Sequence, residues 1–269
     1  MSLTQNVIVL IFIFSNNKVN NKKIIYDVGA NNGDDIEYYL KKSDLVIAIE
    51  ANPKLCEIIQ DRFKTEIENK KLIVENCVVT ILDEETEVPF YINRSNHVLS
   101  QYPKPLNIDE FDEISLPAKN IINIVNKYGE PFYIKIDVEH YDQKILKKLL
   151  ENKIIPTYIS AEAHNVEIFP SLVVLGNYNS FKIVDGNSVS KKYKDHKIQT
   201  LNGIEAYSFP HHSAGPFGND IHGPWMTAHN FFHILGIIGL GWKDIHASKV
   251  DASDPNYRPP PQVNISVKL

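Results

Sequence analysis

Short apolar runs rich in β-branched residues alternate with helical patterns from Lys22 to Pro210, and this alternation constrains the fold more than any other feature of the chain. It is typical of an α/β domain built around a parallel sheet. The run at residues 45–49, "LVIAI", is apolar throughout, as in a strand that is buried on both faces. The sequence therefore predicts a mostly parallel sheet with helices on both faces.

Seven strands are expected in this sheet, and helical spacing separates most of them. The expected strands lie at residues 23–29, 45–50, 71–79, 132–139, 157–163, 181–186 and 203–209, with an inserted or hairpin strand at 87–94. Helices are expected at residues 34–42, 54–63, 119–129, 141–152, 166–176 and 226–239. Proline at position 53 suits a first helical turn, and Gly129 suits a helix end.

The 269 residues are enough for one core domain with flanking parts. After Pro210 the chain is rich in Gly, Pro and His, yet Phe217 and Trp225 need burial, so this segment is expected to pack on the substrate side of the core. The expected parts are an extension at 1–21, the core domain at 22–210, the substrate-side segment at 211–250 and a tail at 251–269.

The charge and the cysteines limit the partners and the compartment. Asp and Glu number 33 against 28 Lys and Arg, and a net charge of −5 offers no footprint for nucleic acid, so a small-molecule partner is expected. Two cysteines alone favour a reducing, cytoplasmic compartment.

The apolar run at residues 7–14 is far shorter than the roughly 20 residues that span a bilayer, so a buried or edge strand is expected there. The oligomeric state is left open.

The ends of the first two strands indicate the kind of ligand, because ligands of open α/β sheets bind at the carboxyl ends of the strands. Asp27 ends the first strand, and a turn from Gly29 to Gly33 follows. A dinucleotide fingerprint would need further glycines where Asn31 and Asp34 stand, which disfavours NAD. Acids in the first turn of the next helix, Asp34 and Asp35, would repel a pyrophosphate.

Glu50 ends the second strand, where a carboxylate can accept hydrogen bonds from both hydroxyls of a ribose. The two strand ends together indicate a nucleoside without phosphates. S-adenosylmethionine fits, with its cationic groups facing acids such as Asp27 and its ribose meeting Glu50.

Three segments resemble the landmark segments of FkbM-type methyltransferases, which belong to the class I S-adenosylmethionine-dependent superfamily. They are "IIYDVGANNGDDIEYYL" at 24–40, "VIAIEANP" at 46–53 and "YIKIDVEHYDQKILKKL" at 133–149. Residues 213–225 and 241–247 resemble a segment of some members. The resemblance implies a Rossmann-like seven-stranded sheet with a reversed last strand, and methyl transfer to a hydroxyl, often on a sugar or a natural product. It also implies cofactor contacts at Asp27, Gly29, Asn31, Gly33 and Glu50, with the adenine near Asn76 and Cys77.

One position departs from the family pattern, since His140 stands where the family has glycine. Glycine there permits a close backbone approach. His140 either keeps the same backbone shape with its ring outside or fills part of the acceptor pocket. This departure concerns the identity of the acceptor and not that of the cofactor.

Transfer to a hydroxyl needs a base for the departing proton. Glu139, beyond the end of the fourth strand, is the first candidate, and His164, which follows Glu162 after the next strand, is the second. Asp137 also stands at this strand end, although an ion pair with Lys135 would explain it equally well. His211 and His212 are expected to line the acceptor pocket.

No metal is the main expectation. Magnesium held by Asp137, Glu139 and Asp185 is an alternative, because these are hard oxygen ligands. His229 and His233 have the spacing of a helical zinc pair, but Asn230 replaces the usual Glu and no third ligand follows.

The sequence thus predicts an S-adenosylmethionine-dependent O-methyltransferase that acts on a small molecule or a saccharide. The alternatives are a module that binds the same cofactor without turnover, with His140 as its sign, and a nicotinamide-dependent oxidoreductase.

Overall fold

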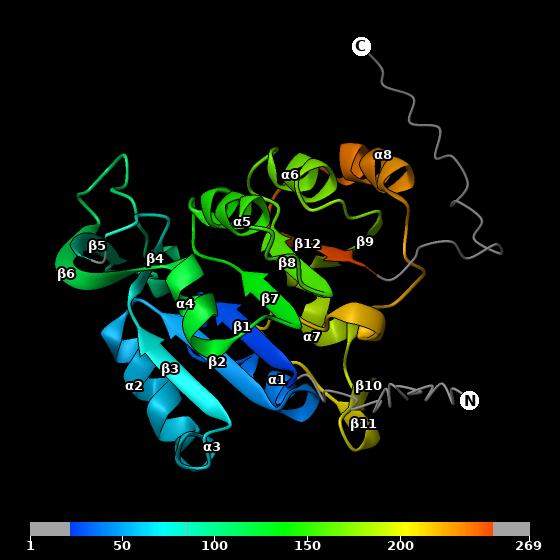
Figure 1. Ribbon diagram of the computed structural model, residues 1–269, viewed down its shortest axis with the longest axis horizontal. Helices are drawn as coiled ribbons and strands as arrows, with labels where there is room; N and C mark the ends of the chain where they lie inside the picture. Colours follow the sequence, from blue (N-terminus) through cyan, green and yellow to red (C-terminus); the bar gives the residue numbers. More distant parts are fainter. Residues whose placement is uncertain (1–21, 85, 250–269) are drawn as a thin grey trace, which may run out of the picture.

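A seven-stranded sheet with the strand order β3-β2-β1-β7-β8-β12-β9 forms the centre of the protein (Figure 1). The computed structural model describes residues 22–84 and 86–249, and the predictions made for residues 1–21 and 251–269 lie outside them. Neighbouring strands of the seven-stranded sheet are parallel except for β12, which is antiparallel to both β8 and β9. The strands are β1 (Ile24–Val28), β2 (Leu45–Glu50), β3 (Leu72–Asn76), β7 (Tyr133–Ile136), β8 (Tyr158–Glu162), β9 (Ser180–Asp185) and β12 (Lys243–Ser248). The expected α/β class with a reversed last strand is confirmed.

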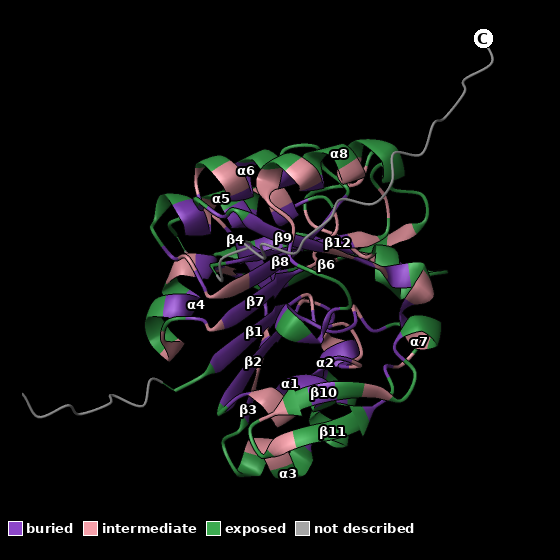
Figure 2. Cartoon of the chain, turned by 90° about the vertical axis from the view of Figure 1, so that its right-hand side faces the viewer, coloured by how far each residue is buried: buried purple, intermediate pink, exposed green. Residues whose placement is uncertain are grey.

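Helices cover both faces of the sheet, and the strands between them are buried (Figure 2). Along β1, Ile24 and Tyr26 belong to the core on one face and Ile25 to the core on the other, as the period of two requires. One face carries α1 (Ile36–Lys42), α2 (Pro53–Arg62) and α7 (Val189–Lys192). The other carries α4 (Ile121–Tyr128), α5 (Asp142–Glu151), α6 (Ile168–Val174) and α8 (Ala228–Ile238), while α3 (Lys64–Glu68) packs beside β3.

A small second sheet is inserted after β3. The expected single strand at 71–79 is divided at Cys77, and its second half becomes β4 (Val78–Thr80). The expected inserted strand is β5 (Glu87–Asn93), and its antiparallel partner β6 (Phe111–Asn120) was not expected. The order is β4-β6-β5, with a 3-10 helix at His97–Leu99 and a separate core of Val78, Val88, Phe90, Leu116 and Ala118.

The prediction that residues 203–209 form a strand of the main sheet is wrong. β11 (Gly203–Tyr207) instead forms a hairpin with β10 (His196–Thr200), which a two-residue connection places directly before it. Ile204 on β11 is 71% exposed, which a central strand would not allow. The seventh strand is β12, so the segment at 211–250, expected to pack on the core, contributes a strand to the core sheet itself. Short 3-10 helices lie at Gly186–Ser188 and Gly218–Asp220.

The backbone is left-handed at Gly29, after β1, and at His140, after β7. Gly29 has φ +86°, and a Cβ there would lie 1.7 Å from the carbonyl oxygen of Asp137. The glycine is therefore required by the close packing of two strand ends, and not only by a ligand. His140 has φ +63° and an exposed side chain, which matches the first of its two alternatives. It keeps the shape that glycine favours, at a cost of roughly 1–2 kcal/mol.

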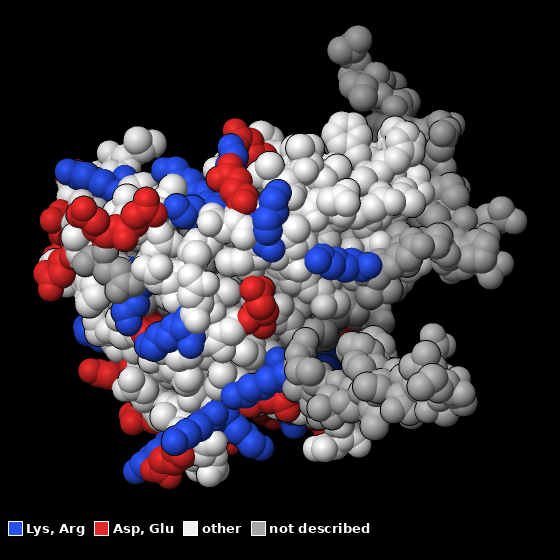
Figure 3. Space-filling model, viewed as in Figure 1, with Lys and Arg blue, Asp and Glu red and all other residues white. Residues whose placement is uncertain are grey.

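Helix α8 exposes apolar side chains to solvent. Phe232 and Ile237 are 62% and 59% exposed, and the surface over this helix shows few charged side chains (Figure 3). The helix has 11 residues. Across residues 22–84 and 86–249, no helix combines the length and the apolar character needed to cross a bilayer.

Candidate functional site

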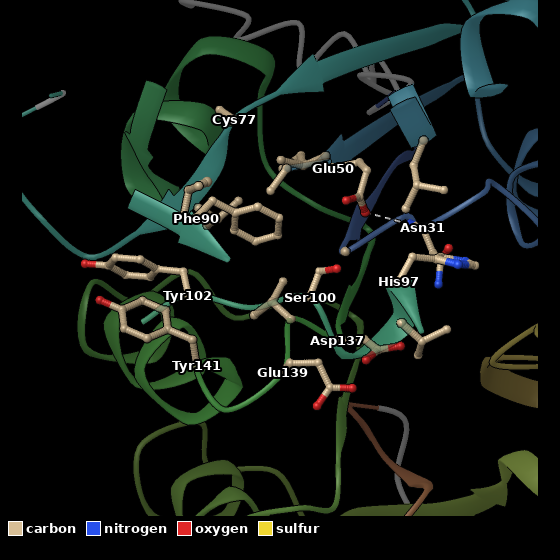
Figure 4. A pocket seen from close by; sticks show the side chains of 18 residues that line it. Asn31, Glu50, Cys77, Phe90, His97, Ser100, Tyr102, Asp137, Glu139 and Tyr141 are labelled. Atoms are coloured by element: carbon tan, nitrogen blue, oxygen red, sulfur yellow. Dashed lines mark hydrogen bonds between the residues drawn. The ribbon is translucent and has the colours of Figure 1, made fainter. Parts of the chain in front are cut away.

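A cavity lies at the carboxyl ends of β1, β2 and β7, beside the small sheet (Figure 4). We call it the first cavity. It has about 690 Å³ of empty space, a figure that includes open solvent at its mouth. It brings together four of the residues expected to contact a cofactor, namely Gly29, Asn31, Glu50 and Cys77.

Glu50 is fixed at the wall of the first cavity by two backbone donors. Its Oε2 accepts a hydrogen bond from the Asn31 N–H at 2.8 Å, and its Oε1 accepts one from the Asn52 N–H at 2.8 Å. Burial raises the pKa of Glu50 to about 7, and the two donors act against this rise. Each carboxylate oxygen has a second lone pair. Glu50 can therefore accept hydrogen bonds from a diol while its backbone partners hold it in place.

Asn31 adds a buried polar side-chain atom to the first cavity. Its backbone is left-handed, with φ +50°, and its side chain lines the first cavity. Oδ1 is buried and has no hydrogen-bond partner among the described residues. An unsatisfied buried acceptor is costly, so a ligand that donates to it is favoured.

Three other residues that were expected to contact the cofactor lie behind the cavity wall. Asp27 is fully buried, and Gly33 packs against Ile36, Ile59 and Phe63. Asn76 uses its Nδ2 to donate to the carbonyl oxygens of Glu50 and Ala51, at 3.0 and 2.8 Å. Asp27, Gly33 and Asn76 shape the site from behind, and their direct contact with a cofactor stays a prediction.

A second cavity adjoins the first. The two share Asn31, Val98, Asp137 and Glu139 in their walls. The remaining wall of the second cavity includes Asp34, Asp35, Lys135, Glu162, His164, His212 and Trp242. Asp137 and Glu139, both beyond the end of β7, therefore stand at the boundary between the cavities.

Lys135 is the buried cation beneath this boundary. Its Nζ lies 3.1 Å from Asp137, 3.4 Å from Asp27 and 4.0 Å from Asp35, so the expected ion pair with Asp137 is confirmed. Burial alone would lower the pKa of Lys135, but the three carboxylates hold it well above its usual value. Burial raises the pKa of Asp27 to about 7 despite this cation. Lys135 is therefore the shared cationic partner of three carboxyl groups.

The two base candidates lie in the second cavity with different surroundings. Burial raises the pKa of Glu139 to about 7, and the neighbouring Asp137 and Asp142 add to this rise. Burial lowers the pKa of His164, so its ring is neutral at pH 7. His164 Nδ1 lies 3.1 Å from Glu162 Oε2, without the geometry of a hydrogen bond. Both candidates are therefore suited to accept a proton near neutral pH.

The other predicted residues are only partly brought to the site. His212 lines the second cavity, whereas His211 and His140 line neither of the two. Asp185 also lies outside both, so the expected magnesium site of Asp137, Glu139 and Asp185 is not assembled. His229 and His233 face each other across 3.3 Å on the exposed side of α8. In the described part of the chain, no three His, Cys, Asp or Glu side chains are placed to hold a metal ion.

Sequence reasoning missed most of the aromatic wall. Tyr102 and Tyr141 lie side by side in the first cavity, with ring centroids 5.1 Å apart (Figure 4). Phe90, His97 and Ser100 join them from the inserted segment. Trp242, in the second cavity, stands against Gly186, where a Cβ would meet its ring at 2.5 Å. The only signal for it was its place in the segment at 241–247.

Phe217 and Trp225 are buried in the core, as their size and apolar character predict. Phe217 stacks on Tyr133 with the ring centroids 4.0 Å apart, and Trp225 stacks on Tyr158. Neither lines the first or the second cavity. The tryptophan that lines the second cavity is Trp242.

Comparison with known proteins gives a family and a set of similar folds. The profile of the family described as Methyltransferase FkbM domain matches residues 27–182. The crystal structure of methyltransferase FkbM from Methylobacillus flagellatus KT is similar, with 14% identity, a TM-score of 0.43, and coverage of 61% of this chain and 40% of that chain. The chain thus spans well under half of that protein.

Two further similar structures come from precorrin enzymes. The C-terminal domain of precorrin-6Y C5,15-methyltransferase from Rhodobacter capsulatus has 12% identity, a TM-score of 0.38, and coverage of 84% of this chain and 79% of that chain. Precorrin-6y C5,15-methyltransferase from Geobacter metallireducens GS-15 has 10% identity, a TM-score of 0.34, and coverage of 70% and 76%. No curated protein sequence matches the chain.

Proposed function

The chain belongs to the FkbM methyltransferase family, and from this premise we propose that it transfers a methyl group from S-adenosylmethionine to an oxygen of a saccharide or another small hydroxylated molecule. The single observation that carries the proposal is the pair of adjoining cavities, with Glu50 fixed in the first and Glu139 at their boundary. A cofactor and an acceptor can meet at such a boundary.

The residues of the first cavity fit the cofactor. Glu50 is held with free lone pairs toward the cavity, where it would accept hydrogen bonds from the ribose hydroxyls, and Asn31 Oδ1 would accept another from the ligand. Cys77, Phe90 and Tyr102 offer a largely apolar wall for the adenine. S-adenosylmethionine supplies an activated methyl group when bound.

The residues of the second cavity would orient the acceptor and remove its proton. Most of the catalytic gain in such a transfer comes from holding the reacting groups in line. Glu139 is our first candidate for the base, because it lines both cavities and its pKa lies close to neutrality. His164 is the second.

The alternative of a binding module without turnover has lost its motivating feature. Its sign was His140 in place of the family's glycine, and the side chain of His140 is exposed outside both cavities. The nicotinamide alternative requires a phosphate cradle, but Asp34 and Asp35 stand at the start of α1.

Calorimetric titration tests the proposal. S-adenosylmethionine should bind and NAD should not, and transfer of a labelled methyl group to hydroxylated acceptors should follow. Absence of binding by S-adenosylmethionine would refute the proposed function.

The replacement Glu50→Ala should weaken the binding of S-adenosylmethionine by about 10- to 100-fold, since a hydrogen bond to a charged group contributes about 1.5–3 kcal/mol. The dissociation constant from titration measures this. Glu57→Ala, which removes an exposed carboxylate of α2, is the matched control and should leave the constant unchanged. Equal affinities of the two variants would remove Glu50 from the ribose site.

A further inference from the structure

The second cavity has more carboxyl groups in its wall than cations to pair with them. Among the described residues, five carboxylic acids line it, and Lys135 is the only lysine or arginine in its wall. The five are Asp34, Asp35, Asp137, Glu139 and Glu162. Asp27 and Asp244, both buried, add further carboxyl groups behind the wall.

Three of these carboxylates have partners within the chain. Asp34 pairs with Arg62 at 3.1 Å, and Asp137 pairs with Lys135. Asp35 accepts hydrogen bonds from the Ser213 hydroxyl and from the Ala214 N–H. These three acids are accounted for by the fold itself.

Glu139 and Glu162 differ from the other three. Within the described residues, neither forms an ion pair with a lysine or an arginine. Glu162 is 95% buried, since its exposed fraction is 5%, and its Oε2 has no hydrogen-bond partner in the same residues. His164, 3.1 Å away, brings no charge at neutral pH because burial lowers its pKa. A buried acceptor that faces a cavity without a partner indicates a ligand group that donates to it.

The proposed cofactor site adjoins only one of these two acids. Glu139, which also lines the first cavity, is the acid next to the cofactor. Glu162 ends β8 and lines the second cavity but not the first. Glu162 is therefore the acid available to contact the acceptor.

We propose that the acceptor is an amino-bearing saccharide, whose ammonium group binds to Glu162 while a neighbouring hydroxyl faces Glu139. This inference rests on the proposed function and names its substrate class. Charge-assisted hydrogen bonds to a buried carboxylate are about twice as strong as neutral ones, so the ammonium would orient the sugar. Trp242, in the same cavity and 41% exposed, offers an apolar face to the sugar ring.

The acceptor preference is tested by titration into protein saturated with S-adenosylhomocysteine, whose sulfur is uncharged. Glucosamine, N-acetylglucosamine and glucose are the probes, at a pH where the free amine is protonated. Glucosamine should bind at least about 10-fold more tightly than the other two, which corresponds to one charged hydrogen bond. Burial raises the pKa of Glu162 to about 10, so its carboxyl group is protonated in the free protein. Binding of the glucosamine ammonium group should therefore release this proton, and the dependence of the binding heat on the buffer measures the release.

The variant Glu162→Gln should lose both the preference and the proton release. It removes a carboxyl group that is already neutral in the free protein, so it should fold normally, and thermal melting checks this. Glu151→Gln, an exposed position at the end of α5, is the matched control and should keep both.

Two results would overturn the inference while leaving the proposed function intact. One is equal or tighter binding of N-acetylglucosamine, and the other is the absence of binding by glucosamine to protein that still binds the cofactor. Failure to bind S-adenosylmethionine would instead refute the proposed function.

Discussion

Glutamine in place of Glu139 should lower kcat by about 10²- to 10⁴-fold, the usual contribution of a positioned general base. The replacement keeps the shape of the side chain and removes its ability to take the proton of the acceptor hydroxyl. The dissociation constant of S-adenosylmethionine should stay close to that of the wild type, because the proposed contacts with that ligand are made by Glu50 and Asn31. Single-turnover rates and calorimetry measure the two effects separately.

The pH profile gives an independent check on Glu139. A base must be deprotonated to act, and the pKa of Glu139 is about 7. The kcat of the wild type should therefore fall as the pH falls through about 7, and the residual activity of Glu139→Gln should lack this step. Glu68→Gln, an exposed change on α3, should behave as the wild type does. Normal turnover of Glu139→Gln together with loss of turnover in His164→Gln would transfer the role to His164.

Lys135→Met should reduce the free energy of unfolding by about 3–5 kcal/mol, because it leaves buried carboxylates without their cation. For a chain of this size the loss corresponds to a fall in Tm of roughly 10 °C. Lys148→Met removes a lysine whose partner, Asp83, is largely exposed, and should change stability by less than about 0.5 kcal/mol. Thermal and urea unfolding of both variants measure the difference.

The deficit of Lys135→Met should depend on pH in one direction. The folded-state pKa of Asp27 is already raised to about 7 by burial, and removal of the lysine raises it further. A carboxyl group with a raised pKa contributes stability below its unfolded pKa, near 4, and loses that contribution as the pH rises through its folded pKa. The deficit should therefore be largest above pH 7 and should shrink toward pH 4. A deficit that is constant over this range would contradict the three-acid arrangement.

The parts of the fold that depend on local patterns could be predicted from the sequence. The apolar run of β2 and the turn after β1 placed Glu50 and Gly29 correctly at the carboxyl edge of the sheet. Chain periodicity does not reveal which distant strand supplies a charge partner. Asp27 was expected to face a cationic ligand, and the structure gives it Lys135 from β7.

The rest of the site comes from segments without regular spacing. Tyr102 and His97 lie in the inserted part between β5 and β6, where turns rather than strand or helix patterns set the backbone. The last strand was misplaced for a related reason. The alternation of apolar residues at 203–207 correctly indicated a strand. This strand pairs with the neighbouring β10 in a hairpin and not with the main sheet. Only the pairing of β12 with both β8 and β9 shows where the sheet is completed.

That pairing has a consequence for how the chain reaches its folded state. β8 and β9 do not touch each other in the sheet, since β12 lies between them. Until residues 243–248 are available, each of the two strands has an open edge, and β9 has no partner in the sheet. During synthesis, the half of the sheet that holds Glu162 must therefore wait for β12, and pairing over such a distance in sequence is slow. The second cavity is therefore completed only after β12 has paired, and until then the open edges of β8 and β9 are sites at which a nascent chain can aggregate or bind a chaperone.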